Sequence, residues 1–97
     1  MINQPTVPPV DLTKYIEVRI FQERPHIRGR RVPVATVAYN HRTHGWTVAE
    51  TAYNFTLSEA EVLAALLYYQ EHQALIDAQE EAYQAELDEA YRLYGEH

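Results

Sequence analysis

A long stretch without glycine or proline limits the folds that are open to this chain. It runs from Ser58 to about Tyr94, and a helix over all of it would contain about 35 residues and measure ~55 Å at 1.5 Å per residue. We expect one uninterrupted helix here. A chain of 97 residues builds one small domain with a modest core, so this helix is longer than the domain is wide. Part of it must project from the domain or fold back on it.

Residues before this stretch mark the ends of two shorter helices. Pro33 stands where the first position of a helix accepts proline, and Gly45 ends the helix that follows. Thr47 precedes Glu50 by three residues, which is the spacing of a capping box and predicts a second short helix.

Two capping boxes are open for the start of the long helix. Thr56 precedes Glu59, and Ser58 precedes Glu61, at the same spacing. Two short helices and a long one, joined by short turns, predict a tri-helical helix-turn-helix unit of the homeodomain-like kind.

A small β-element precedes these helices. Residues Tyr15 to Phe21 alternate between two faces as a half-buried strand does, and His26 to Val32, with a turn at Arg28 and Gly29, is the expected partner. The predicted fold is therefore mainly α. It comprises an extended, Pro-rich arm over 1–10, a tri-helical helix-turn-helix domain with a small N-terminal β-hairpin over 11–76, and an acidic amphipathic C-terminal helix over 77–97.

The charges are divided between the two halves of the chain. Residues 1–42 contain seven of the eight Lys and Arg against three acids, whereas residues 43–97 contain eleven acids and one base, Arg92. The net charges of +4 and −10 add to the −6 of the whole chain. This division predicts two surfaces for two partners, because a soluble surface alone needs no separation of sign.

The C-terminal helix carries apolar side chains on one side. They form a candidate partner-binding stripe at spacings of four, four and three residues: Tyr83, Leu87, Tyr91 and Tyr94. Such a helix suits the groove of another protein. Arg92 lies among these residues, and two roles are open to it: it reaches acidic groups of the partner, or it pairs with Asp88 and offsets the helix dipole.

The sequence also predicts a homodimer. The strand has two partly apolar faces in a domain too small to cover both, and a seven-residue repeat of mainly apolar residues continues along the long helix. Its polar interruptions, Gln73 and Glu80, are too many for a strong coiled coil. The candidate interface residues are Ile16, Val18, Ile20, Tyr69 and Ile76.

Four arginines are candidate DNA-binding residues: Arg28, Arg30, Arg31 and Arg42. Their guanidinium groups could neutralise DNA phosphates, and the equally favoured alternative is that they pair with the acidic helix of the same chain. Specific base reading by the third helix is disfavoured, because its first turn holds Glu59 and Glu61 and no base.

Several classes of function are not expected. The chain has no cysteine, and His41 and His44 lack further ligands at a suitable spacing, so we predict no metal site. No nucleophile, phosphate loop or cofactor motif is present, and adjacent acids on a helix do not converge in a pocket, so we expect neither a cofactor nor an enzyme. Neither a signal peptide nor a membrane span is apparent, so we expect a soluble cytoplasmic protein.

Spaced motifs in the middle of the chain resemble a known family. They are Pro25 to Val37 (PHIRGRRVPVATV), Gly45-Trp46-Thr47, Leu57-Ser58, Ala60-Glu61-Val62, Ala65-Leu66, Tyr68-Tyr69, His72 and Ile76-Asp77-Ala78. These motifs are similar to domain-of-unknown-function family 433, although Arg30 stands where the family usually has threonine. Members of this family are classed as VapB-type antitoxins.

The resemblance implies a type II toxin–antitoxin module whose toxin is a PIN-type ribonuclease. We therefore expect an antitoxin that neutralises this toxin through its C-terminal helix, and operator DNA is a second candidate partner. Because a PIN-type ribonuclease gathers carboxylates around Mg²⁺, Arg92 could substitute for the metal in that cluster. Two alternatives stay open: a dimeric helix-turn-helix DNA-binding regulator without a toxin, and a structural dimerisation module.

Overall fold

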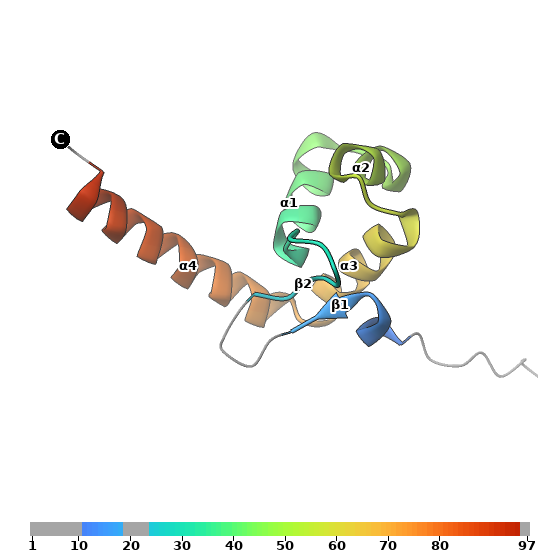
Figure 1. Ribbon diagram of the computed structural model, residues 1–97, viewed down its shortest axis with the longest axis horizontal. Helices are drawn as coiled ribbons and strands as arrows, with labels where there is room; N and C mark the ends of the chain where they lie inside the picture. Colours follow the sequence, from blue (N-terminus) through green and yellow to red (C-terminus); the bar gives the residue numbers. More distant parts are fainter. Residues whose placement is uncertain (1–10, 19–23, 96–97) are drawn as a thin grey trace, which may run out of the picture.

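The computed structural model describes residues 11–18 and 24–95. The predicted arm over 1–10, the candidate interface residue Ile20 and the end of the predicted strand lie outside the described residues. The described part is mainly helical (Figure 1). In chain order, its elements are η1 (Leu12–Lys14), β1 (Ile16–Glu17), β2 (His26–Ile27), α1 (Val34–His44), α2 (Val48–Phe55), α3 (Glu59–Glu71) and α4 (Gln73–Tyr94).

The ends of the first two helices follow from local capping. Pro33 is the residue just before α1 rather than its first helical residue, and Gly45 ends α1 with a φ of 65°. The left-handed region favours glycine, so this residue stops the helix at low cost. Thr47 and Glu50 form the predicted capping box of α2, and the two hydrogen bonds from Thr47 lower the pKa of Glu50, the backbone bond most.

The capping box of α3 uses Ser58 and Glu61. The backbone amide of Glu61 donates to Ser58 Oγ at 3.0 Å, and the amide of Ser58 donates to Glu61 Oε1 at 2.8 Å. This pair, and not Thr56 with Glu59, begins the helix. Thr56 instead ends α2 with a φ of 56°, so the turn between the helices is fixed from both sides.

The predicted β-hairpin is present in a short form. β1 and β2 pair antiparallel, with Ile16 opposite Ile27. Gly29, at a φ of 75°, lies in the turn that follows β2, where the amide of Ile27 donates to the carbonyl of Val32 at 2.9 Å. The turn therefore brings the chain directly to the start of α1.

The core lies between the hairpin, α1–α3 and the start of α4. Its fully buried large side chains are Ile27, Val34, Val37, Val62, Thr51 and Ile76. Thr51 is the polar member, and its hydroxyl donates to the carbonyl of Thr47 at 2.8 Å. Because this hydroxyl donates a hydrogen bond, its burial in the apolar core leaves no donor unpaired at Thr51.

The expectation of one uninterrupted long helix is wrong. α3 and α4 are separate helices, and His72 between them has non-helical angles of φ −125° and ψ 27°. The His72 ring stacks on Tyr68 at 4.2 Å, and its Nδ1 lies 3.1 Å from the Tyr68 carbonyl oxygen. A side chain that bonds to a backbone acceptor competes with the regular helix ladder, so the helix breaks here without glycine or proline.

After this break, α4 leaves the domain. Figure 1 shows it projecting away from the bundle of α1–α3, and the molecule measures 69 × 29 × 23 Å. Of the two alternatives that the sequence left open for the long helical segment, the structure therefore shows projection and not folding back. Within the residues that the structure describes, no helix has the length and apolar character that a membrane span requires.

Candidate functional site

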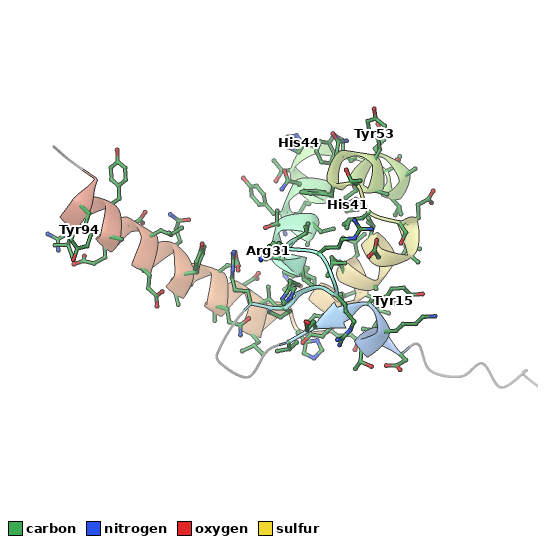
Figure 2. The ribbon with its side chains drawn as sticks, viewed as in Figure 1. Tyr15, Arg31, His41, His44, Tyr53 and Tyr94 are labelled. Atoms are coloured by element: carbon green, nitrogen blue, oxygen red, sulfur yellow. The ribbon has the colours of Figure 1, made fainter. Side chains whose placement is uncertain are left out.

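The projecting helix exposes the predicted apolar stripe. Side chains of Tyr83, Leu87, Tyr91 and Tyr94 are 40%, 45%, 69% and 73% exposed. Figure 2 shows Tyr94 at the outer end of α4, far from the bundle. Exposure therefore increases along the helix away from the domain.

The stripe continues the face by which α4 enters the core. At about 100° per residue, Ile76, Tyr83, Leu87 and Tyr94 fall within about 40° of one another around the helix. Ile76 is 1% exposed and packs in the core. The same face is thus covered by the domain at its start and uncovered beyond it, as is typical of a surface that meets another molecule.

Polar contacts hold the first turns of α4 against the domain. Arg24 donates from one guanidinium nitrogen to both Glu80 carboxylate oxygens, at 2.8 and 3.0 Å. Its guanidinium carbon also lies 3.9 Å from the centre of the Tyr83 ring. Tyr69 of α3 donates to Asp77 at 2.7 Å.

The bond to Asp77 is also the main reason that the pKa of Tyr69 is raised above its ordinary value of 10.0. Burial and the charge of Asp77 act in the same direction, and the nearby Arg42 guanidinium opposes them. A phenol that donates to a carboxylate keeps its proton, because the bond exists only while the proton is present.

A cavity of about 250 Å³ lies where α4 meets α1. Its lining residues come from α1, α3 and α4: Ala35, Thr36, Tyr39, Asn40, Arg42, Tyr69, Asp77 and Glu80. The carboxylates of Asp77 and Glu80 already accept bonds from Tyr69 and Arg24. The cavity therefore joins an exposed tyrosine, Tyr39, to the base of the projecting helix, and Arg42 is the cationic residue of its lining.

Arg92 points away from the stripe. It lies five residues after Leu87, which is about 140° around the helix. Its guanidinium pairs with Glu89 within α4, at 2.6 Å, and not with Asp88 as the sequence suggested. Arg92 and the stripe therefore belong to different sides of α4.

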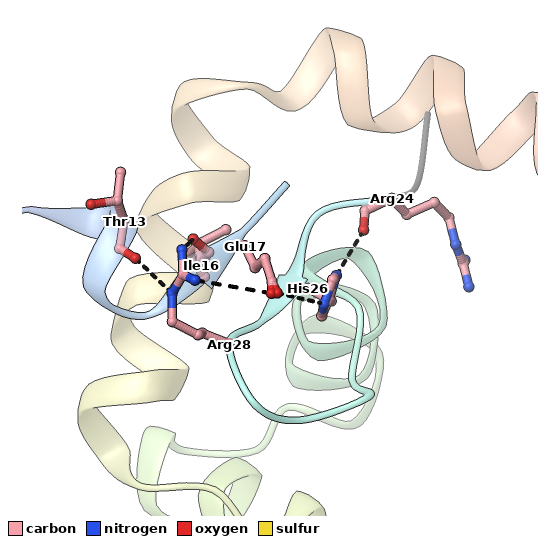
Figure 3. Close-up of polar contacts among 6 residues, drawn as sticks. All are labelled: Thr13, Ile16, Glu17, Arg24, His26 and Arg28. Atoms are coloured by element: carbon pink, nitrogen blue, oxygen red, sulfur yellow. Dashed lines mark hydrogen bonds and ion pairs between the residues drawn. The ribbon is translucent and has the colours of Figure 1, made fainter. Parts of the chain in front are cut away.

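Two of the four candidate DNA-binding arginines bond to other residues of the same chain. Arg28 donates to the carbonyl oxygens of Thr13 and Ile16, at 2.9 and 3.3 Å, and so joins the turn to η1 and β1 (Figure 3). Arg30 lies 3.7 Å from Glu61. Arg30 thus contacts an acid of α3, whereas Arg28 bonds to the backbone of η1 and β1 and not to an acidic helix.

The other two arginines bond to no carboxylate or backbone carbonyl within the described residues, although the side chain of Arg42 bonds to Tyr69. Arg31 and Arg42 are exposed, and Figure 2 shows Arg31 beside the start of α1. Arg42 lies at the cavity near Tyr69. The four residues therefore do not form one uniform cationic surface.

The candidate dimer residues occupy different environments. Ile16 and Ile76, at 3% and 1% exposed, belong to the core of one chain and not to a surface for a second copy. Tyr69 is half-buried. Val18 is 55% exposed and is the one of these described residues that is free for an interface.

Sequence reasoning missed an exposed apolar face on α3. Leu63 and Leu67 are 55% and 37% exposed, and their spacing of four places them on one side of the helix. The signal was present in the sequence as two leucines four residues apart, which lie outside the seven-residue repeat on which the dimer prediction rested.

The two histidines of α1 have structural contacts. His41 Nδ1 lies 3.3 Å from the hydroxyl of Thr51, and the His44 ring stacks on Trp46 at 4.3 Å. Across residues 11–18 and 24–95, no three His, Cys, Asp or Glu side chains gather as a metal site would require.

Comparison with known proteins identified one family. A family model described as "Protein of unknown function (DUF433)" matches residues 16–69, which is more than half of the chain. No curated protein and no solved structure matches the chain. The matched region contains the hairpin and α1–α3 up to Tyr69, and it ends before α4.

Proposed function

The chain belongs to the DUF433 family, and we propose that it is the antitoxin of a type II toxin–antitoxin module that acts in the cytoplasm. In this proposal α4 binds a PIN-type ribonuclease toxin and neutralises it. The matched domain supplies the folded base from which the helix projects.

The uncovered stripe on α4 is the observation that supports this proposal. Leu87, Tyr91 and Tyr94 are between 45% and 73% exposed on a helix that has left its own domain. Aromatic and aliphatic side chains on one helix face serve as anchors in the groove of a partner, where they supply most of the binding energy. The described part of α4 carries six acids and one base, so the rim of that groove should be basic.

The proposal is tested with the product of the neighbouring reading frame. We expect the wild-type chain to bind it and to inhibit its ribonuclease activity, and the double variant Leu87→Ala/Tyr91→Ala to lose about 100-fold in affinity. The matched control is Tyr53→Ala/Leu75→Ala, which also removes one tyrosine and one leucine. They are 84% and 56% exposed and lie outside the stripe, on α2 and in the first turn of α4. Equal losses in both variants, or no binding by the wild type, would refute the proposal.

Arg92 is tested in the same assay. Since it faces away from the stripe and pairs with Glu89, we expect Arg92→Ala to inhibit the ribonuclease fully at matched occupancy. A variant that binds normally but no longer inhibits would instead support insertion of this arginine into the carboxylate cluster of the toxin.

Autoregulation is a secondary part of the proposal. Arg31 and Arg42 are the remaining candidates for phosphate contacts, since Arg28 bonds to backbone carbonyls and Arg30 pairs with Glu61. Binding to the DNA upstream of its own gene should be weak and steeply salt-dependent, and each of Arg31→Ala and Arg42→Ala should flatten the salt slope by about one unit. Failure to shift this DNA at low salt, alone and with the toxin, would exclude autoregulation.

A further inference from the structure

Arg24 connects the hairpin to α4 across 56 positions of the sequence. It bonds to both oxygens of Glu80 and packs its guanidinium against the ring of Tyr83. Glu80 and Tyr83 are three residues apart, so they lie side by side on the helix surface. One side chain therefore contacts two adjacent points of the projecting helix.

The backbone of Arg24 is held in turn by the domain. His26 Nδ1 lies 3.3 Å from the Arg24 carbonyl oxygen, and Figure 3 shows this contact beside the one between His26 and Glu17. The next carbonyl, that of Pro25, accepts from the amide of Val34 at 2.9 Å. The guanidinium is thus carried by a backbone that is tied to both the hairpin and α1.

Few other contacts fix the direction of α4. Ile76 is its buried residue, and Tyr69 bonds to Asp77 one residue later. From Gln84 onward, the hydrogen bonds and ion pairs of the described side chains stay within the helix. The residue before α4, His72, is non-helical, so no continuous helix backbone transmits a direction from α3.

We propose that Arg24 is the positioning residue of α4. It holds the helix at a fixed angle to the domain and packs against the ring of Tyr83, the first residue of the stripe. The link between the stripe and toxin binding rests on the proposed function. The positioning itself is a property of the free chain.

Distances between spin labels test the positioning directly. The chain has no cysteine, so Ala49→Cys on α2 and Ala85→Cys on α4, both at exposed alanines, give two unique labelling sites. We expect one narrow distance distribution in the labelled parent and a clearly broader one after Arg24→Ala. Arg24→Lys, which keeps the charge without the planar fork, should lie between them. Arg31→Ala is the matched control and should leave the distribution narrow.

A distribution in Arg24→Ala that equals the parent would overturn the inference, and so would equal broadening in Arg31→Ala. Glu80→Gln removes the acceptor charge from the other side of the contact, and it decides the question if Arg24→Ala does not fold. In this variant we expect a broader distribution of label distances. We also expect about tenfold faster amide exchange between Ile76 and Tyr83, with unchanged exchange in α1. An unchanged Glu80→Gln would likewise overturn the inference.

Binding to the neighbouring gene product separates the two proposals. A helix that is free to pivot loses more freedom on binding, so Arg24→Ala should bind about three- to tenfold more weakly than wild type. If the wild type does not bind at all, the proposed function fails, whereas the label distances still decide the role of Arg24.

Discussion

The contacts of individual arginines show that the number of positive charges in a sequence does not predict a cationic surface. The sequence offers seven cationic side chains in residues 1–42, which suggests a surface for phosphate. Arg24, Arg28 and Arg30 instead bond to Glu80, to backbone carbonyls and to Glu61. An arginine with such partners has given up part of its capacity to bind an outside anion, because its donors have fixed directions.

The bond between Tyr69 and Asp77 predicts a pH dependence at high pH. The folded-state pKa of Tyr69 is raised above 10.0, so the stabilisation that this phenol provides is fully present below pH 10 and is lost as pH rises through the folded-state pKa. We expect wild type to be more stable than Tyr69→Phe at pH 8, and the difference to shrink above pH 10. Urea unfolding of both proteins across this range measures it.

Asp77→Asn is the control for this prediction. It keeps the size of the side chain and removes its charge, so the pKa of Tyr69 should fall toward 10.0. A difference in stability between wild type and Tyr69→Phe that stays constant through pH 11 would contradict the assignment of the raised pKa to this bond.

The ends of helices were predictable from the sequence wherever the residues that fix them lie close together in the chain. The capping boxes join residues three apart, and Gly45 ends α1 by its own backbone conformation. The break at His72 was missed because it depends on a ring stacked on Tyr68 and not on glycine or proline. The Arg24 contact was missed because nothing local relates residues 56 positions apart.

The end of α1 provides a test of this local reasoning. A Cβ at Gly45 would meet no atom within 4 Å, and its φ is +65°, so the cost of Gly45→Ala comes from backbone conformation and not from a clash. We expect a loss of about 1 kcal/mol in the free energy of unfolding, which corresponds to a fall in Tm of about 4–8 °C. Calorimetry of the purified variant measures this loss.

Gly45→Asn is the matched variant, because asparagine tolerates the left-handed region better than alanine does. It should be more stable than Gly45→Ala. Equal losses in the two variants would show that the left-handed conformation is not the cause.

At the scale of the whole molecule, some of the acids in the second half of the chain pair with arginines of the first half and others do not. Arg24–Glu80 and Arg30–Glu61 join the basic and acidic halves within one chain. The acids of α4 beyond Glu80 have no arginine of the first half as a partner in the described residues, and Arg92 is their only base. The unmatched charge is therefore concentrated on the part of the helix that projects, together with the stripe.

The exposed apolar residues of the domain favour a dimer interface at other positions than the sequence predicted. Ile16 and Ile76 are buried within one chain, whereas Leu63 and Leu67 on α3 are exposed. A domain of this size buries a limited share of its apolar surface, and pairing of two copies about a two-fold axis covers such a face. We therefore expect a homodimer in which the α3 faces of two copies meet.

Sedimentation velocity at tens of micromolar checks this prediction. The wild type should sediment at about twice the monomer mass of 11.3 kDa, and Leu63→Glu/Leu67→Glu should sediment as a monomer, because four carboxylates would then face one another across the axis. Tyr53→Glu is the control, since Tyr53 is 84% exposed on α2 and should remain dimeric. A wild type that sediments as a monomer would contradict the prediction of a homodimer. A double variant that stays dimeric would leave Val18 as the described candidate for the interface, and α4 would then project from a dimer built on the hairpin rather than on α3.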